Sequence, residues 1–341
     1  MASIGLILIV VAFVSAFLVA FVVMKRATRL GLVQHPNARS SHVVPTPTGG
    51  GLGLVVGGTL SGLLMLLLLP WLAVPILMAS LLIALLGYWD DRKPLPASWR
   101  LGAQVLLMGA MIAVLPLEGL ARFTGLDWPE WALMLTFTLL GALWLNLFNF
   151  MDGIDGLAGS EAITILLSAT LLAYLGHPDA ALHPLFWWML GLAAATTGFM
   201  LLNWPPARLF MGDVGSTYLG LMIAFFAFAS ISGGWLSAPQ WLIVSTLFWA
   251  DGLTTLFRRL LLKEPVWQAH RRHAYQRLAR RWSHARVTGL AIGLNLVVLL
   301  PVAYVAALVP DWAWPLAIVT VLGFMGLSYA AGAGAPLDAE A

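Results

Sequence analysis

Long apolar stretches constrain this chain more than any other feature of its sequence. A helix that crosses the hydrocarbon core of a bilayer needs about 20 mainly apolar residues, with a range of roughly 17–25. Only 10% of the 341 residues are charged, whereas a soluble domain carries about 25%. The sequence therefore predicts an all-α polytopic integral membrane protein with about eleven transmembrane helices, or ten if the short sixth stretch does not cross. The stretches are approximately 3–24, 50–69, 71–89, 101–117, 131–150, 160–175, 185–203, 215–232, 239–257, 287–309 and 312–331.

Positive charge gathers in alternate loops of this arrangement. The first apolar stretch is followed, not preceded, by Lys25, Arg26 and Arg29, which favours an uncleaved helix with its N-terminus outside over a signal peptide. Every Lys and Arg except Arg122 then falls in a cytoplasmic loop, where basic residues are enriched. We therefore expect a periplasmic N-terminus, a cytoplasmic C-terminus and one transmembrane domain over 1–341. The cytoplasmic loops would be 25–49, 90–100, 151–159, 204–214 and 258–286.

Composition excludes several kinds of function. The chain has no cysteine, so it has no disulfide, thiolate nucleophile or cysteine-ligated metal. Its net charge of +3 is too small to indicate nucleic acid as a partner. It has no internal repeat of the kind that many transporters contain.

Five acids lie at the predicted cytoplasmic ends of helices, in three separate loops and among glycines. They are Asp90, Asp91, Asp152, Asp155 and Asp213. Carboxylates gathered in this way repel one another unless a cation joins them, and a few hard oxygen ligands completed by phosphate oxygens describe a Mg²⁺ site. Asp152 and Asp155 would point to the same side if their segment is helical. The alternative is that all five are loop acids at the water boundary.

The loop 258–286 supplies half of the 18 Lys and Arg residues and is expected to contain an amphipathic helix. His270, His273 and Arg277 would share one helical face at i, i+3, i+7, and such a face suits a diphosphate. The alternative is a helix lying on anionic lipid. Its apolar stripe would consist of Trp267, Tyr275, Leu278 and Trp282.

The first cytoplasmic loop contains HPNARSSHVVPTPTGGG at 35–51. Three successive glycines at the start of a helix can expose backbone N–H groups to an anion. Glycines at this position can equally serve close packing.

Four segments resemble the polyprenyl-phosphate N-acetylhexosamine-1-phosphate transferases, a glycosyltransferase family 4 type of enzyme. They are GYWDDRKPLP (87–96), NLFNFMDGIDGLAGSE (146–161), NWPPARLFMGDVGS (203–216) and HRRHAYQRL (270–278). The RSSH…PTPTGGG segment is similar to the O-antigen branch. The resemblance implies ten or eleven helices, a cytoplasmic active site in the bacterial inner membrane, and Mg²⁺ or Mn²⁺. It also implies a UDP-N-acetylhexosamine donor and undecaprenyl phosphate as acceptor.

The resemblance also implies roles for individual residues. Asp90 and Asp91 match the acidic pair at the prenyl-phosphate side, and Asp213 matches the principal metal ligand, with Asp152 as a second ligand. His270 and His273 match a catalytic histidine cluster. The substrate contacts would be Asn146, Asn149, Asp152, Asp155, Asn203, Arg271, Arg277 and Phe210, the last beside the uracil.

The chain departs from the family pattern at three places. Arg271 and Arg272 interrupt the histidine run, Val43 stands where the peptidoglycan branch has a lysine, and Lys93 comes one place early. These departures concern the contacts to sugar and acceptor more than the reaction.

The implied reaction is attack by a lipid phosphate oxygen on the β-phosphorus of the UDP-sugar, with release of UMP. Its barrier is mainly electrostatic. A phosphate monoester is largely dianionic at pH 7, so Asp90 and Asp91 are expected to position first and to abstract a proton second. A covalent aspartyl-phosphate intermediate stays open.

Two other classes of protein fit the sequence less well. A CDP-alcohol phosphatidyltransferase would need an arginine soon after DG and two further aspartates four apart, and DGIDGLAGSE has neither. A transporter would place charges at mid-membrane, and Asp251 is the one charged residue of this sequence that is a candidate for such a position. The sequence does not decide between GlcNAc, FucNAc and QuiNAc, or between a monomer and a homodimer.

Overall fold

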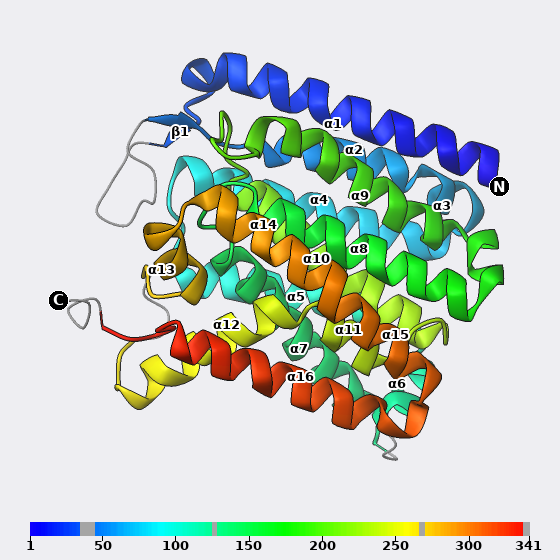
Figure 1. Cartoon of the computed structure of the whole chain (residues 1–341). Helices are drawn as coiled ribbons and strands as arrows, with labels where there is room; N and C mark the ends of the chain where they lie inside the picture. Colours follow the sequence, from blue (N-terminus) through cyan, green and yellow to red (C-terminus); the bar gives the residue numbers. More distant parts are fainter. Residues whose placement is uncertain (35–44, 125–127, 266–269, 337–341) are drawn as a thin grey trace.

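The computed structural model describes residues 1–34, 45–124, 128–265 and 270–336. Residues 35–44, which include Val43 and the RSSH segment, and Trp267 lie outside the described residues. The described chain is an α-helical bundle whose helices run side by side (Figure 1). This confirms the prediction of an all-α polytopic membrane protein.

Nine helical segments of the described chain are long and apolar enough to cross a membrane. Two of them are interrupted: Gly51–Leu68 divides into α2 (Gly51–Ser61) and α3 (Leu63–Leu68), and His284–Leu308 contains a π-helical turn, η2 (Asn295–Leu299), between α14 (His284–Leu294) and α15 (Leu300–Leu308). The others are α1 (Ala2–Leu30), α4 (Pro70–Arg92), α7 (Glu130–Phe150), α8 (Leu157–Gly176), α9 (Pro184–Asn203), α10 (Asp213–Ser232) and α16 (Pro310–Ala330).

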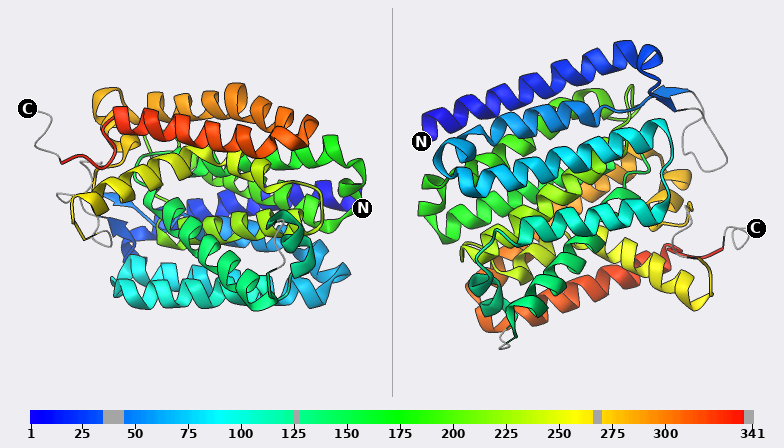
Figure 2. Two further views of the ribbon diagram at one scale, coloured as in Figure 1. Left: turned by 90° about the horizontal axis from the view of Figure 1, so that it is seen from below. Right: turned by 180° about the vertical axis from the view of Figure 1, so that it is seen from behind.

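The nine segments coincide with nine of the eleven predicted stretches, the short sixth one included. The stretch 101–117 corresponds to α5 (Ala97–Ile112), which has 16 residues. The stretch 239–257 is broken at Ser245 into α11 (Ala238–Val244) and α12 (Thr246–Leu261). Figure 2 shows α5 packed along α4 in the bundle. The number of crossings and their orientation stay predictions.

Short elements close the two ends of the bundle. One end, where α4 finishes and α10 begins, also carries α13 (Ala274–Arg281) and the antiparallel pair β1 (Val33–Gln34) and β2 (Thr46–Pro47). We call it the acidic end. The opposite end carries α6 (Leu117–Thr124) and the 3₁₀-helix η1 (Pro178–Leu182). The first residues of α1 and the last residues of α16 lie at opposite ends (Figure 1).

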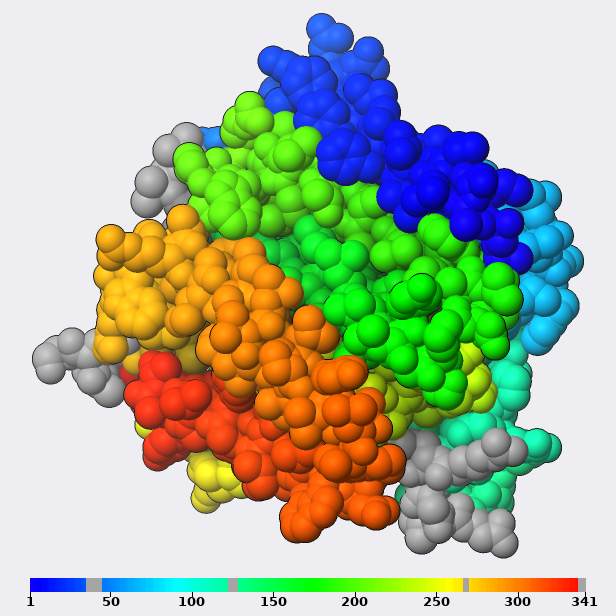
Figure 3. Space-filling view, turned by 45° about the vertical axis from the view of Figure 1, so that its right-hand side comes forward, coloured from blue at the N-terminus to red at the C-terminus, as the bar shows by residue number. Residues whose placement is uncertain are grey.

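Burial separates central from peripheral helices. The apolar window of α10 is 83% buried, whereas those of α1 and α16 are only 22% and 17% buried. Figure 3 shows α14–α15 and α16 side by side on one face, with α9 beside α1 on the other part of that face. Because the outward residues of α1, α14–α15 and α16 are apolar, these three segments are suited to contact with lipid chains. The central helix α10 begins with Asp213 and therefore holds that acid at the acidic end.

Candidate active site

Asp213 lies where residues from four helices meet. Its Oδ1 accepts a hydrogen bond of 3.0 Å from Asn149 of α7, and its Oδ2 lies 3.3 Å from Nη1 of Arg100 in α5. The same Nη1 donates to Oδ2 of Asp90 at 2.6 Å. The structure therefore joins Asp90 and Asp213 through Arg100, a residue that no sequence motif marks. The sequence offers one indication of Arg100: it is among the few cations of the 90–100 loop.

Asp91 supports the start of α10. Its two carboxylate oxygens accept from the backbone N–H groups of Asp213 at 2.8 Å and Val214 at 3.2 Å. A carboxylate at this position satisfies free N–H groups and complements the positive end of the helix. Gly212 has φ of 75°, and a Cβ there would lie 2.5 Å from Oδ2 of Asp91. The motif MGDVGS therefore needs this glycine beside the acid.

Asp152 and Asp155 lie in the loop 151–156 between α7 and α8, so the prediction of a shared helical side is wrong. Asp155 ties the loop to its neighbours: its Oδ2 accepts from the backbone of Ala207 at 3.1 Å and lies 3.2 Å from Nδ1 of His284. Within the described residues, no hydrogen-bond donor contacts the carboxylate of Asp152. Burial, together with the negative charges of Asp213 and Asp155, raises the pKa of Asp152 to about 7.

These carboxylates fit a divalent cation. The described residues contain no cluster of three or more His, Cys, Asp or Glu side chains that could hold a metal by themselves. Mg²⁺, however, is usually held by one or two carboxylates, with water and substrate phosphates as its other ligands. Among the described residues, no positive partner offsets the burial that raises the pKa of Asp152. Asp213 and Asp152 therefore form a donor set of the kind that Mg²⁺ accepts.

Three asparagines hold the loops of the acidic end. Asn149 donates to Asp213 and, at 2.8 Å, to Ser216. Asn146 donates to Gln104 of α5 at 2.7 Å. Asn203 is buried; its Oδ1 accepts from Gly156 at 3.0 Å and its Nδ2 donates to the carbonyl of Leu209 at 2.9 Å. Asn203 thus joins the loop 151–156, which we call the DG loop, to the 204–212 loop through one backbone partner in each.

Gly50 and Gly51 of the first loop serve packing, so the anion interpretation is wrong for these two glycines. The N–H groups of Gly50 and Gly51 donate to the carbonyls of Phe210 and Met211, each at 2.9 Å. A Cβ on Gly51 would lie 2.3 Å from the backbone of Gly215 in α10. The backbone of Phe210 also donates to Pro47 at 2.8 Å. The first loop and the Phe210 segment are therefore fixed to each other.

The predicted helical face of the loop 258–286, which we call the basic loop, is also wrong. Because α13 begins at Ala274, His270 lies before the helix, His273 is its N-cap residue and only Arg277 is inside. The rings of His270 and His273 nevertheless stack, with 5.0 Å between centroids. The structure therefore brings the two histidines together by loop geometry rather than by helical spacing.

Asp251 fixes the start of α13. The side chain of His273 is buried, and its Nδ1 lies 3.1 Å from Oδ1 of Asp251. The same carboxylate accepts from the backbone N–H groups of Ala274 and Tyr275, both at 3.0 Å. A buried acid on α12 therefore orients the histidine and caps the helix at once. In the sequence, Asp251 stands out only as an acid within an apolar stretch, and that feature indicated a transporter.

The other residues of the basic loop have mixed environments. Burial, with the positive charges of His273, Arg259 and Arg272, lowers the pKa of His270 to about 3, so its imidazole is neutral. Arg277 is buried and donates to the carbonyls of Ala335 and Pro336. Arg271 is partly buried, and burial lowers its pKa.

Tyr275 docks α13 on the DG loop. It is buried, and its hydroxyl donates to the carbonyl of Phe150 at 2.9 Å. A Cβ on Gly153 would lie 2.1 Å from this hydroxyl oxygen. The expected lipid-facing stripe is therefore wrong for Tyr275, whereas Trp282 is 48% exposed.

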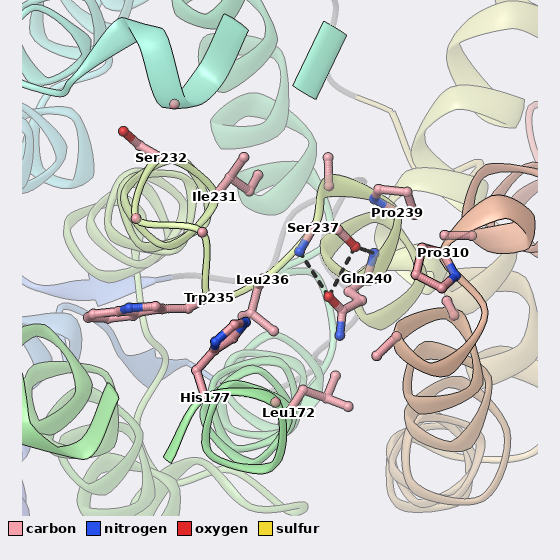
Figure 4. Close-up of a pocket in the computed structure, with 18 of the residues that line it drawn as sticks. Leu172, His177, Ile231, Ser232, Trp235, Leu236, Ser237, Pro239, Gln240 and Pro310 are labelled. Carbon is pink, nitrogen blue, oxygen red and sulfur yellow. Dashed lines mark hydrogen bonds between the residues drawn. The ribbon is translucent and has the colours of Figure 1, made fainter. Parts of the chain in front are cut away.

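A cavity of about 610 Å³ lies at the opposite end of the bundle and contains none of the predicted site residues. It lies among the ends of α8 and α10 and the starts of α11 and α16. Figure 4 shows Ser237 and Gln240 hydrogen-bonded to each other on its wall, near His177. The acidic groups therefore do not belong to this cavity.

Comparisons with known proteins agree with the motifs. The model of "Glycosyl transferase family 4" matches residues 73–231, which include all five acids of the acidic end. A probable undecaprenyl-phosphate N-acetylglucosaminyl 1-phosphate transferase of Bacillus subtilis is 27% identical over 84% of this chain and 81% of its own length. A decaprenyl-phosphate N-acetylglucosaminephosphotransferase of Mycobacterium tuberculosis is 32% identical over 76% of this chain and 72% of its own. A phospho-N-acetylmuramoyl-pentapeptide-transferase of Moorella thermoacetica is 34% identical over 59% of this chain and 67% of its own length.

Two relatives match along most of their length, and the acidic motifs lie inside the family model. This chain therefore belongs to glycosyl transferase family 4, in the superfamily of polyprenyl-phosphate N-acetylhexosamine-1-phosphate transferases.

Proposed function

We propose that this multi-pass membrane enzyme transfers an N-acetylhexosamine 1-phosphate from a UDP-sugar to undecaprenyl phosphate in the bacterial inner membrane. UMP is released, and the product is a sugar joined to the lipid through a diphosphate. The family supports the reaction class, since the relatives carry names of sugar-phosphate transferases that act on polyprenyl phosphates. The observation that carries the proposal is the meeting of Asp213, Arg100 and Asp90 beside the unpaired carboxylate of Asp152.

The first requirement of this reaction is charge neutralisation, because one phosphate anion attacks another. Asp213 and Asp152 would hold Mg²⁺, with Mn²⁺ as the alternative; the bound ion would stabilise charge on the donor diphosphate. Arg100 is 36% exposed and already lies between Asp90 and Asp213. We assign it to the acceptor phosphate, with Asp90 holding its guanidinium in place.

Proton abstraction is a smaller requirement. The attacking phosphate monoester has a second pKa near 6 and is largely dianionic at pH 7. Asp90 accepts from the backbone of Leu95 and from Arg100, both at 2.6 Å. Asp91 is held by α10. Both acids are therefore assigned to positioning, and the reaction is written as a single displacement.

The basic loop would complete the site from the side of α13. His273 is held by Asp251 and stacks on His270, so both rings have fixed orientations. We assign His273, with Arg271, to the substrate diphosphate. His270 is neutral in the free protein, and a bound polyanion would favour its protonation. Asn149, Phe210 and Asp155 stay assigned to the nucleotide side.

The donor is proposed from the names of the relatives, several of which act on N-acetylglucosamine. UDP-GlcNAc is therefore the first donor to test, and the product would start O-antigen or another cell-envelope polysaccharide. Purified protein with undecaprenyl phosphate, Mg²⁺ and a panel of UDP-N-acetyl sugars should release UMP with at least one donor. A chain that releases no UMP from any of them but releases CMP from a CDP-alcohol would refute the proposal and favour another nucleotide-phospholipid transferase.

A matched pair of variants tests the histidine assignment. His273→Ala should lower kcat strongly at saturating UDP-sugar. Arg280→Ala, an exposed charge at the end of α13, should cost little, since surface charges near a membrane contribute about 1 kcal/mol each. Equal and mild losses from both changes would make the helix a lipid-facing element.

A further inference from the structure

The last described residues of the chain fold back against the acidic end of the bundle. After α16 ends at Ala330, residues 331–336 have the sequence AGAGAP, and we call them the C-terminal strap. The side chains of Ala333 and Ala335 in this segment are only 0% and 6% exposed. Gly332 and Gly334 have φ of 89° and 73°, in the left-handed region that favours glycine. The strap is therefore a packed element with a specific backbone path.

The strap is hydrogen-bonded to α13 and to the loop before it. Arg277, in the middle of α13, donates from Nη2 to the carbonyls of Ala335 and Pro336, the latter at 3.0 Å. The N–H of Gly334 donates to the carbonyl of Arg272 at 2.7 Å. Arg277 is only 4% exposed, so its charge depends on protein acceptors for its hydrogen bonds. The strap supplies two of these acceptors.

The strap is also fixed to α12, the helix that carries Asp251. Arg258 donates from Nη1 to the carbonyl of Ala333 at 3.2 Å. Its guanidinium lies 4.5 Å from the ring centroid of Tyr329, near the end of α16. A Cβ on Gly334 would lie 2.8 Å from Cβ of Arg258, so the strap and α12 are in close contact. Figure 1 shows the end of α16 and α13 at the same end of the bundle.

We propose that the C-terminal strap is a positioning element that holds α13, and with it His273, against the DG loop for phosphoryl transfer. The inference rests on the proposed function, which assigns His273 to the substrate. An isolated helix shorter than about 12 residues is marginal in water, and α13 spans only Ala274–Arg281. Its position therefore depends on its contacts: Asp251 at its start, Tyr275 on the DG loop, and the strap at Arg277.

Two truncations separate the strap from the residues after it. A stop after Pro336 keeps the strap, and a stop after Ala330 removes it. The chain has no cysteine, so Lys25→Cys on α1 and Arg280→Cys on α13 allow two spin labels to report their distance in any variant. The full chain and the stop after Pro336 should give the same narrow distance distribution and the same kcat.

The stop after Ala330 should broaden that distribution and lower kcat by on the order of tenfold to a hundredfold, because a displaced catalytic group costs this much. Arg258→Ala should reproduce part of both effects. Arg258→Lys, which keeps a donor and a charge, should restore the narrow distance distribution and the wild-type kcat. An unchanged distance distribution after removal of the strap would overturn the proposal, whatever happens to kcat or Tm. Absence of UMP release in the wild type would refute the proposed function instead, while the label distances would still decide whether the strap holds α13.

Discussion

Oδ1 of Asp251 lies 3.1 Å from Nδ1 of His273, although 22 positions separate the two residues in the chain. The carboxylate comes from α12, and the imidazole precedes α13. Because Asp251 also accepts from the backbone of Ala274 and Tyr275, one side chain sets both the histidine ring and the direction of the helix.

Asp251→Asn should lower kcat by on the order of tenfold or more, because the amide keeps the shape but removes the charge that orients His273. UMP release by the purified variant measures this. Thr255→Val is the matched control, since it removes only a hydroxyl that donates to the same carboxylate at 3.1 Å. It should cost about 1 kcal/mol in stability and little activity. Equal kcat losses in the two variants would contradict an orienting role.

Asp213→Asn should reduce turnover by on the order of a hundredfold or more while the protein stays folded in detergent, because the charge that would hold Mg²⁺ is lost. Asp179→Asn, an exposed acid at the opposite end, is the control and should behave as the wild type. Retention of more than about a tenth of the wild-type rate, a loss under ~1.4 kcal/mol, would exclude Asp213 as the principal ligand.

Gly212→Ala should be strongly destabilising. The backbone of Gly212 has φ of 75° and ψ of 169°, a region essentially confined to glycine that costs other residues about 1–3 kcal/mol, and the contact of an added Cβ with Asp91 would add about 1–3 kcal/mol. Gly102→Ala in α5 is the matched control, because no atom lies within 4 Å of its Cβ and alanine favours a helix by about 0.5–1 kcal/mol. Thermal unfolding in detergent should give a lower Tm for the first and an equal or higher Tm for the second.

His270 should make the protein less stable in mild acid. Above its ordinary pKa of 6.5 the imidazole is neutral in both folded and unfolded chains and has no effect. As the pH falls below 6.5, the unfolded chain binds a proton that the folded protein accepts only near pH 3, so stability decreases. His270→Gln should therefore show a smaller drop in Tm between pH 7.5 and pH 5 than the wild type. His177→Gln, at the opposite end, should leave the drop unchanged, and an unchanged drop in His270→Gln would show that burial does not hold His270 neutral.

The orientation of the bundle can be measured with reporter fusions. Alkaline phosphatase fused after Ala341 should be inactive, because eleven crossings that start outside end in the cytoplasm. The same enzyme fused after Gly176, at the end of α8, should be active. An active fusion at Ala341 would refute the count of eleven.

The helices follow from the sequence because lipid leaves the backbone few alternatives. An apolar stretch in hydrocarbon must satisfy its N–H and C=O groups internally, and a helix does so by itself. Even the short stretch 160–175 is part of a full helix, α8. Breaks within a stretch, such as the one at Ser245, depend on neighbouring helices and were not predicted.

The position of the five acids at one end of the bundle also follows from the sequence, since hydropathy fixes where each helix ends. Their directions do not. Asp90 and Asp91 are adjacent, yet one binds Arg100 and the other caps α10. Asp91 meets the start of a helix 122 positions away, and Arg100, the partner of Asp90, also reaches Asp213 113 positions away, so no local pattern encodes this packing.

Hydropathy and motifs determined by themselves that this is a helical membrane protein of a phosphotransferase family, because both are properties of short segments. Only the tertiary structure decided that Arg100 bridges two acids, that Asp251 orients His273 and that an Ala/Gly segment after α16 packs against α13. Each of these is a contact between segments that are distant in sequence. Such a contact forms only when packing of the whole bundle brings a charged group to the partners that can satisfy it.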